Sequence, residues 1–193
     1  MITILIAVAG ITGIGKSYYK DKLCEKLNFK KIKIITTRSP RKGEKNHEDK
    51  IFVNDEELEK LVAEGKIAYK FEMLGNIYAY SKEELFSDEN TIFELHYNTI
   101  KDFKKICPNL RVIYLLPKDI EVSKNKLRER NLPEEVEKAR IMEIDEHYNK
   151  INTDKELINM FDYVLYNNYD EKSEEEVINL VKKLLIEEKN NNR

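Results

Sequence analysis

Three of the six glycines in this chain fall within six residues, at Gly10, Gly13 and Gly15. A chain that uses glycine sparingly places it where the backbone has to turn tightly or approach another group closely. The apolar run 2–9 before these glycines is typical of a strand that is buried on both faces, as in a parallel sheet. Residues 16–27 follow with apolar side chains at helical spacing. The sequence therefore predicts a buried strand, a glycine loop and a helix in direct succession.

The glycine loop also has the spacing of a phosphate-binding motif. Residues 10–17 fit the pattern GxxxxGK[ST], which ends here in Lys16 and Ser17. In this pattern backbone N–H groups surround nucleotide phosphates, the lysine contacts the β- and γ-phosphates, and the hydroxyl binds Mg²⁺. A chance match in a glycine turn is the alternative, but the flanking strand and helix favour nucleotide binding. The ATP-binding residues expected in this loop are Gly10, Thr12, Gly13, Ile14, Gly15, Lys16 and Ser17.

Strand and helix patterns alternate along most of the remaining chain. Such alternation is typical of a three-layer α/β fold around a parallel sheet, here the core of a P-loop NTPase. The alternation breaks after residue 37, with a polar loop over 38–50, a helix over 55–64 capped by Asp55, and two strands over 67–71 and 77–80. We therefore expect an inserted subdomain over 38–81. Further strands are expected over 31–37, 91–95, 111–116 and 163–166, and further helices over 81–85, 98–106, 120–130, 133–148 and 173–188.

Length and charge bound what the chain can do. Its 193 residues suit one domain, and its net charge of −2 lacks the basic excess of a nucleic-acid-binding protein. The longest apolar run, 4–9, is far shorter than the roughly 20 residues of a membrane-spanning helix. Cys24 and Cys107 form neither a CxxC metal motif nor a disulfide framework. We expect a cytoplasmic protein without nucleic-acid or membrane partners, with a frayed tail over 189–193.

A second candidate anion site follows the strand expected over 31–37. Arg38 and Arg41 are separated by Ser39 and by Pro40, which stiffens the segment. Two guanidinium groups at this spacing could bind a phosphate through paired hydrogen bonds. Taken alone, the segment is more typical of a solvated basic loop. Next to a phosphate loop it suggests a kinase, which must hold a donor phosphate and an acceptor phosphate in line.

Four stretches together resemble the guanylate kinase family. They are the loop 10–17, the segment 36–44 (TTRSPRKGE, against the family's TTRxxRxGE), residues 75–78 (GNIY, against GNxYG) and residues 163–167 (YVLYN, against YxxxN). Their order and spacing extend the resemblance from about residue 4 to about residue 186. The resemblance implies a single domain over 1–188, with a core of 1–37, 82–125 and 149–188, an acceptor-binding insert over 38–81 and a lid over 126–148.

The resemblance also implies an activity and roles for individual residues. The γ-phosphoryl group of ATP would pass, with Mg²⁺, to GMP or dGMP in a monomer or homodimer. Ser17 would bind the metal, and Glu94 would order the water around it. In the lid, Lys126 stands where the family has Arg, and Asn131 where it has Gly. The catalytic candidates are Lys16, Arg38, Arg130 and Arg140; Asn167 would lie near the adenine; and the acceptor-binding candidates are Arg38, Arg41, Tyr78, Tyr69, His96 and Glu72.

The guanine contacts of the family are the part of the pattern that this chain lacks. At their positions it has Ile34, Lys50, Tyr69 and His96. A carboxylate can accept both the N1–H and the exocyclic amine of guanine, and these four side chains cannot do so in the same way. Glu72 or Asp49 could reach the base instead. Two alternatives therefore stay open: the same chemistry on another phosphorylated acceptor, and a non-catalytic module that binds a phosphorylated ligand.

The histidines and the tyrosines after the loop lead to separate expectations. His96 either contacts the acceptor or packs at the end of a strand. His47 and His147 lie in charged stretches and are expected to be exposed. Tyr19 is expected in the core, and Tyr18 is left unassigned.

Overall fold

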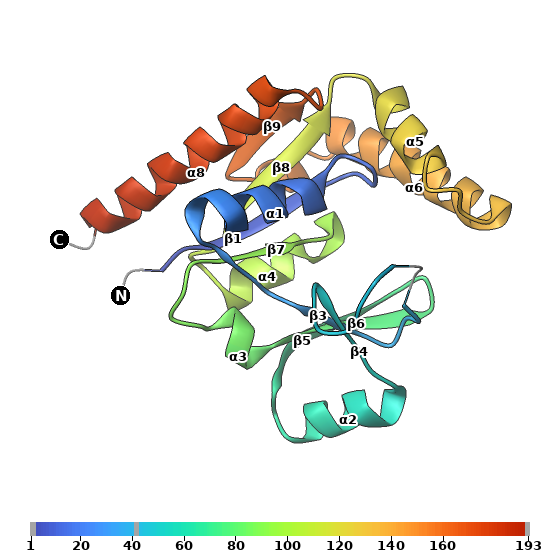
Figure 1. The fold of residues 1–193 in the computed structure, drawn as a ribbon, viewed down its shortest axis with the longest axis vertical. Coiled ribbons are helices and arrows are strands. Elements are labelled where there is room, and N and C mark those ends of the chain that lie inside the picture. Colours follow the sequence, from blue (N-terminus) through green and yellow to red (C-terminus); the bar gives the residue numbers. More distant parts are fainter. Residues whose placement is uncertain (1–2, 41–42, 192–193) are drawn as a thin grey trace.

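A five-stranded sheet forms the centre of the protein. The computed structural model describes residues 3–40 and 43–191. The strand order is β2-β7-β1-β8-β9, and each neighbouring pair is parallel (Figure 1). The mixed α/β fold with a parallel central sheet is the predicted fold class. The strands are β1 (Leu5–Gly10), β2 (Lys30–Lys31), β7 (Thr91–Glu94), β8 (Arg111–Pro117) and β9 (Tyr163–Asn167).

Helices cover both faces of this sheet. On one face Ile6 and Val8 of β1 pack against Leu23 of α1 (Lys16–Leu27) and Val181 of α8 (Glu171–Asn191). On the other face the alternate residues of β1 pack with Phe103 of α4 (Ile100–Ile106), which follows the short helix η1 (Tyr97–Thr99). Because successive side chains of a strand point to opposite faces, the continuous apolar run supplies both layers of the core.

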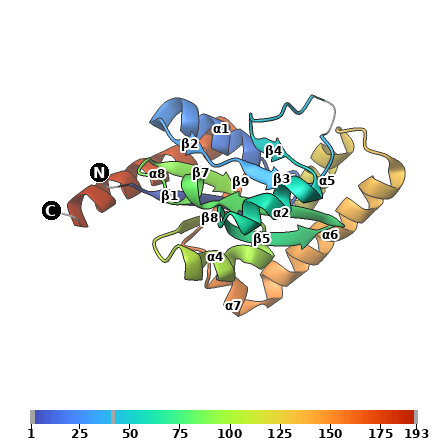
Figure 2. The same ribbon diagram turned by 90° about the horizontal axis from the view of Figure 1, so that it is seen from below.

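A second, four-stranded sheet lies beside the first, in the order β4-β3-β6-β5 (Figure 2). Its strands are β3 (Ile34–Thr36), β4 (Lys50–Phe52), β5 (Ile67–Met73) and β6 (Asn76–Ser81). α2 (Asp55–Ala63) packs on this sheet through Leu58, which contacts a small core with Ile35 and Ala79. A hairpin turn at Leu74 and Gly75, both with positive φ, joins β5 to β6, and α3 (Lys82–Leu85) leads back to the first sheet.

Two local predictions differ from the structure in this region. The single strand expected over 31–37 is two strands in different sheets, because Ile32 is buried in the large core and Ile35 in the small one. The N-cap of α2 is Asn54 and not Asp55. Asn54 Oδ1 accepts from the Glu57 backbone N–H, and the Glu57 carboxylate accepts from the Asn54 N–H, each over 2.8 Å. This reciprocal capping box satisfies two N–H groups that Asp55 alone could not.

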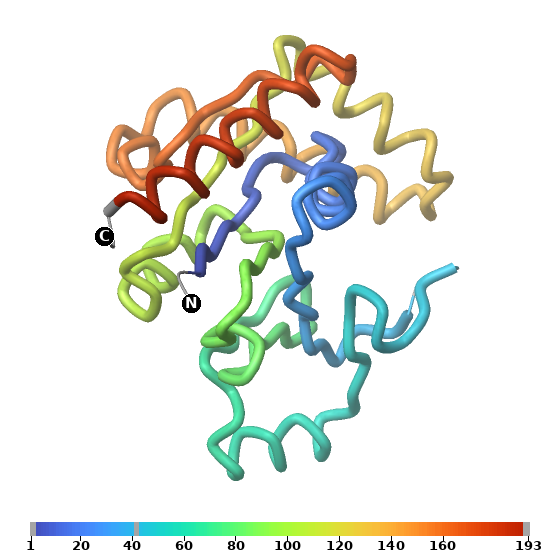
Figure 3. The backbone as a smooth tube through the Cα atoms, turned by 60° about the vertical axis from the view of Figure 1, so that its left-hand side comes forward, coloured from blue at the N-terminus to red at the C-terminus, as the bar shows by residue number. Residues whose placement is uncertain are grey.

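The remaining helices form an arm and a C-terminal layer. α5 (Ile120–Arg128) and α6 (Glu134–Thr153) project from the core apart from the second sheet (Figure 3). α6 runs five residues beyond its expected end at residue 148, and it is followed by the unpredicted helix α7 (Lys155–Ile158). α8 continues to Asn191 through most of the tail that was expected to be frayed. Among the described residues, no helix combines the length and apolar character needed to cross a bilayer.

Candidate active site

The glycine loop lies between β1 and α1, in the predicted order, and its glycines allow close packing. Gly10, Gly13 and Gly15 have φ angles of 147°, 87° and 93°. A Cβ atom on Gly13 would lie 2.6 Å from the Ser123 carbonyl oxygen, and one on Gly10 would lie 2.7 Å from the Leu115 carbonyl oxygen. A larger residue at either position would therefore push the loop away from β8 and α5.

Lys16 lies across this loop. Its Nζ donates to the carbonyl oxygens of Gly10 and Ile11, both over 3.0 Å. Burial lowers the pKa of Lys16, and the carboxylates of Glu94 and Glu143 oppose that effect. The ammonium group is thus held at the loop before any phosphate is bound.

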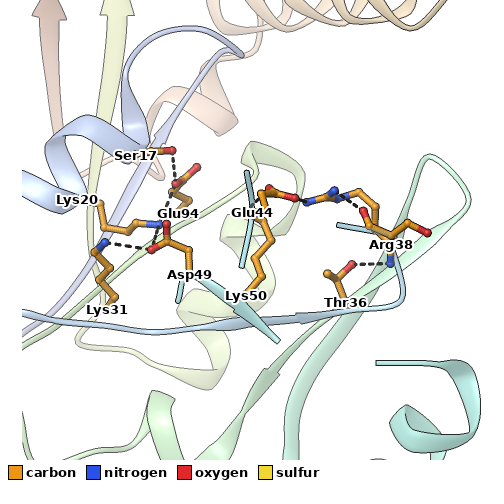
Figure 4. Close-up of polar contacts among 10 residues, drawn as sticks. Ser17, Lys20, Lys31, Thr36, Arg38, Glu44, Asp49, Lys50 and Glu94 are labelled. Atoms are coloured by element: carbon orange, nitrogen blue, oxygen red, sulfur yellow. Dashed lines mark hydrogen bonds and ion pairs between the residues drawn. The ribbon is translucent and has the colours of Figure 1, made fainter. Parts of the chain in front are cut away.

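Ser17 and Glu94 place a hydroxyl and a carboxylate side by side next to the loop (Figure 4). Ser17 Oγ donates to Glu94 Oε1 over 2.8 Å. Burial alone would raise the pKa of Glu94, but Lys20, Lys16 and the Ser17 hydrogen bond hold it below its usual value. A hydroxyl and an ionised carboxylate fit Mg²⁺, which prefers oxygen ligands, keeps several waters and completes its shell with substrate phosphates. Among the described residues, no group of three or more His, Cys, Asp or Glu side chains is placed to hold a metal ion.

Asn167 supports the loop from the end of β9. The side chain is 3% exposed. Its Nδ2 donates to the Ile14 carbonyl oxygen over 2.7 Å, and its Oδ1 accepts from the Tyr19 hydroxyl and the Tyr169 N–H, each over 2.8 Å. These bonds occupy the amide oxygen and one N–H of Asn167, the residue that was expected to lie near the adenine. In the structure Asn167 is a buried support beneath the loop.

Tyr169 is a loop contact that sequence reasoning missed. Its hydroxyl donates to the Gly13 carbonyl oxygen over 3.0 Å and lies 2.9 Å from Ser123 Oγ. Its position two residues after β9 was the available signal, because the carboxyl ends of parallel strands meet at one edge of the sheet. Tyr19, expected in the core, is buried there, while Tyr18 is exposed and its hydroxyl bonds to Glu174.

Arg38 lies at the opposite end of the same region, two residues after β3 of the second sheet (Figure 4). Its guanidinium donates to both carboxylate oxygens of Glu44, over 2.9 and 2.8 Å. Lys50 Nζ lies 3.2 Å from the same carboxylate. Arg41, the other expected arginine of this segment, lies outside the described residues.

The loop and Arg38 line one cleft of about 590 Å³. The cleft brings together most of the predicted site residues. Its walls include Gly10, Thr12, Gly13, Gly15, Lys16, Ser17, Arg38, Tyr78, Glu94, His96, Arg130 and Arg140, and also Ile34, Lys50, Phe71, Met73 and Lys126.

Tyr69 and Glu72 lie outside this cleft. Phe71 and Met73 of the same strand line it, so the alternation of side chains turns Glu72 to the opposite face, where it is exposed. The Tyr69 hydroxyl donates to Asp102 over 3.0 Å, and burial together with that bond raises the pKa of Tyr69 to about 12. Asp49, the other carboxylate considered for the base, pairs with Lys20 and Lys31.

The arm α5–α6 brings further charges to the cleft. Arg140 donates to Glu143 over 2.6 Å. Burial opposes ionisation of Glu143, but His96 and Arg140 lower its pKa to about 2. His96 Nε2 lies 3.7 Å from the other oxygen of Glu143. His96 therefore lines the cleft and pairs with the arm at the same time.

The expectation that His147 is exposed is wrong. This side chain is 3% exposed; its Nε2 lies 2.8 Å from the Tyr114 hydroxyl, and its ring stacks on Tyr97 with 3.7 Å between centroids. The charged stretch around it belongs to α6, whose inner face packs on the core while its outer face is solvated. His47 is exposed, as expected.

A parallel sheet with helices on both faces, a phosphate-type loop at its carboxyl edge and an adjoining cationic cleft define an α/β phosphotransferase. A model of the family "Guanylate kinase" matches residues 3–184. The chain therefore belongs to the guanylate kinase family, a family of ATP-dependent phosphotransferases.

Individual members of the family agree with this assignment. The chain is 25% identical over 169 residues to a guanylate kinase of Clostridioides difficile, covering 85% of this chain and 80% of that protein. It is 30% identical over 131 residues to one of Synechocystis sp., covering 65% of this chain and 69% of that protein. The crystal structure of guanylate kinase from Anaplasma phagocytophilum shares the fold, with a TM-score of 0.69 at 22% identity, over 94% of this chain and 86% of the other.

Proposed function

We propose that this enzyme transfers the γ-phosphoryl group of ATP to a nucleoside monophosphate, with GMP or dGMP as the first candidate and GDP or dGDP as the product. The observation that carries the proposal is the single cleft in which the phosphate loop faces Arg38. Phosphoryl transfer needs two phosphates held in line and their charge neutralised, and it needs no covalent intermediate. Lys16 on one side and Arg38 on the other supply fixed positive charge for both phosphates.

Each part of the cleft has a proposed role. The loop residues 10–17 bind the phosphates of ATP, and Ser17 holds Mg²⁺ with Glu94 ordering its water shell. Mg²⁺ bound by these residues would neutralise charge on the transferring group. Arg130 and Arg140 of the arm, which is proposed as the lid over 126–148, supply further positive charge during transfer. Arg38, Arg41 and Tyr78 of the insert over 38–81 bind the acceptor phosphate. We also propose that the enzyme acts in the cytoplasm as a monomer or homodimer, without nucleic-acid or membrane partners.

A second candidate acceptor is favoured by the charges that line the cleft. Among the described residues, the carboxylates there are those of Glu44, Glu94 and Glu143. Each is paired with a basic side chain: Glu44 with Arg38, Glu94 with Lys20, and Glu143 with Arg140. Guanine requires an acceptor for its N1–H and its exocyclic amine, whereas Lys50 supplies only donors. An acceptor with carbonyl or anionic groups in place of guanine is therefore the alternative substrate.

An acceptor panel tests both candidates. ADP release from MgATP is measured with GMP, dGMP, AMP, CMP, UMP, dTMP, IMP and ribose phosphates. Selective turnover of GMP or dGMP would support the first candidate, and would mean that other residues contact the guanine. Selective turnover of another acceptor would point to the changed positions that line the cleft, which are 34, 50 and 96. A chain that binds MgATP and transfers to none of these acceptors would contradict the proposed kinase activity on this substrate class.

A further inference from the structure

Lys20 is a buried lysine close to the metal side of the cleft. It lies on α1, one turn after Lys16, and is 4% exposed. A buried ammonium group is costly unless it is paired, so its partners indicate why it is there. Those partners are two carboxylates: Lys20 Nζ lies 3.1 Å from Glu94 Oε1 and 3.4 Å from Asp49 Oδ1.

The first partner is shared with Ser17. Glu94 Oε1 accepts both the Ser17 hydroxyl, over 2.8 Å, and the Lys20 ammonium. Among the nearby positive charges, Lys20 also does most to hold the pKa of this half-buried carboxylate below its usual value. Oε1 of Glu94 thus accepts hydrogen bonds from two side chains of α1, Lys20 and the proposed metal ligand Ser17.

The second partner anchors Lys20 from the other sheet. Asp49 precedes β4, and its Oδ1 lies 3.2 Å from Lys31 Nζ of β2 as well as near Lys20 (Figure 4). Burial opposes ionisation of Asp49, but Lys20 and Lys31 outweigh it and keep its pKa below the usual value. The Lys20 ammonium is therefore placed between a carboxylate at the end of β7 and one just before β4 of the second sheet.

We propose that Lys20 is a positioning residue for phosphoryl transfer, whose ammonium, anchored by Asp49, fixes the Glu94 carboxylate towards Ser17 so that the pair can hold hydrated Mg²⁺ with the nucleotide. This inference rests on the proposed function for its catalytic consequence. Its consequence for binding, which is the dependence of nucleotide affinity on Mg²⁺, can be measured with no acceptor present. Changing an outer residue that orients a metal-binding group typically costs about 10- to 100-fold in metal affinity or activity.

The test compares three variants with the wild type. Lys20→Met keeps the length of the side chain and removes its charge; Lys20→Arg keeps the charge and the reach. Lys22→Met removes a lysine from the solvent side of the same helix, where it pairs with Glu25. Calorimetry gives the affinity for a non-hydrolysable ATP analogue with Mg²⁺ and with EDTA, and a thermal melt shows that each variant is folded.

The ratio of these two affinities is the decisive readout. We expect Lys20→Met to bind the analogue in EDTA with an affinity within about twofold of wild type. The factor by which Mg²⁺ raises that affinity should be about 10- to 100-fold smaller in Lys20→Met than in the wild type. Lys20→Arg should recover most of that gain, and Lys22→Met should keep all of it. A folded Lys20→Met protein with the wild-type gain would overturn the proposal. So would equal losses in Lys20→Met and Lys22→Met, or a wild type that gains no affinity from Mg²⁺.

A kinetic measurement separates this proposal from the proposed function. If the wild type turns over an acceptor of the panel, Lys20→Met should lower kcat by about 10- to 100-fold and leave the acceptor KM nearly unchanged. A raised acceptor KM with an unchanged kcat would contradict a role on the metal side. If the wild type turns over no acceptor, the proposed function fails, and the affinity ratio still decides the role of Lys20.

Asp49→Asn should lose part of the affinity that Mg²⁺ adds, because Lys20 then keeps only Glu94 as a charged partner.

Discussion

The guanidinium of Arg38 is already bound to a carboxylate, because it donates to both oxygens of Glu44 over 2.9 and 2.8 Å. A phosphate presents the same pair of oxygens to an arginine as a carboxylate does. Both bonds come from one nitrogen, Nη2, while Nη1 donates to the Ser39 carbonyl oxygen over 2.7 Å. An acceptor phosphate that binds this nitrogen, as we propose, would replace Glu44. Lys50, 3.2 Å from Glu44, can keep the displaced carboxylate paired.

Replacing Arg38 by lysine should weaken acceptor binding. A lysine keeps the charge but loses the paired donors, and hydrogen bonds to charged groups contribute about 1.5–3 kcal/mol. We expect Arg38→Lys to raise the acceptor KM by about 10- to 100-fold and to leave the affinity for MgATP within about twofold. Steady-state kinetics with each substrate varied in turn measure both. Arg111→Lys, at a remote pair with Glu188, is the matched control. An effect on ATP alone would contradict the assignment of Arg38 to the acceptor.

Removing the Lys16 ammonium should mainly reduce turnover. Lys16 is held at the loop by two carbonyl oxygens, and we propose that it contacts the transferring phosphoryl group. Removing one fixed positive donor from such a position typically costs about 10²- to 10³-fold in kcat. We expect this loss in Lys16→Ala, measured as ADP release at saturating substrates. Lys22→Ala on the same helix should retain wild-type turnover. An unchanged kcat in Lys16→Ala would be incompatible with the proposed mechanism.

The features that could be predicted from the sequence are those set by neighbouring residues. The glycine loop requires positive φ at Gly13 and Gly15, and α1 begins at Lys16 and ends at Leu27, the bounds expected from the apolar spacing. The parallel sheet follows from strands that are apolar on both faces. The structure also brings Lys16, Arg38, Arg130 and Arg140 to one cleft, as the resemblance implied.

The features that could not be predicted depend on contacts between distant segments. Asn167 and Tyr169 are more than 150 residues from the loop carbonyls that they support, and their residue types alone do not indicate burial. The break between β2 and β3 arises because Ile32 is buried in the core of the first sheet and Ile35 in the core of the second. Glu72 was placed near the acceptor on its charge alone, whereas pairing with β6 extends β5 to Met73, beyond the expected end at residue 71, and the strand alternation then turns Glu72 away. The burial of His147 depends on Tyr97 and Tyr114, which come from other elements.

Loss of the Asn167 side chain should destabilise the loop and weaken nucleotide binding. Its amide satisfies the Ile14 carbonyl oxygen, the Tyr19 hydroxyl and the Tyr169 N–H. Leaving a buried polar group without its partner costs about 1–3 kcal/mol. We expect Asn167→Ala to lower the free energy of unfolding by about 2–4 kcal/mol, measured by denaturant titration. Tyr19→Phe, which removes one donor only, should lose about 1 kcal/mol. A stable Asn167→Ala protein whose only defect is adenine selectivity would restore the original expectation for this residue.

His147 should stay neutral through the physiological range and make the fold sensitive to acid. Burial, with the nearby charges of His96 and Lys16, lowers its pKa to about 3, against about 6.5 in the unfolded chain. As the pH falls, the unfolded chain protonates this histidine at a higher pH than the folded protein does. The free energy of unfolding should therefore fall as the pH drops from about 6.5 towards 3, by at most about 1.4 kcal/mol per pH unit from this group. Above pH 6.5 it should contribute no slope. NMR should show the resonances of the His147 ring unchanged between pH 8 and pH 5. Denaturant titrations should show that the free energy of unfolding falls less steeply in acid for His147→Gln than for the control His47→Asn, which changes an exposed histidine. A His147 ring that titrates near pH 6.5 in the folded protein would contradict its burial between Tyr97 and Tyr114.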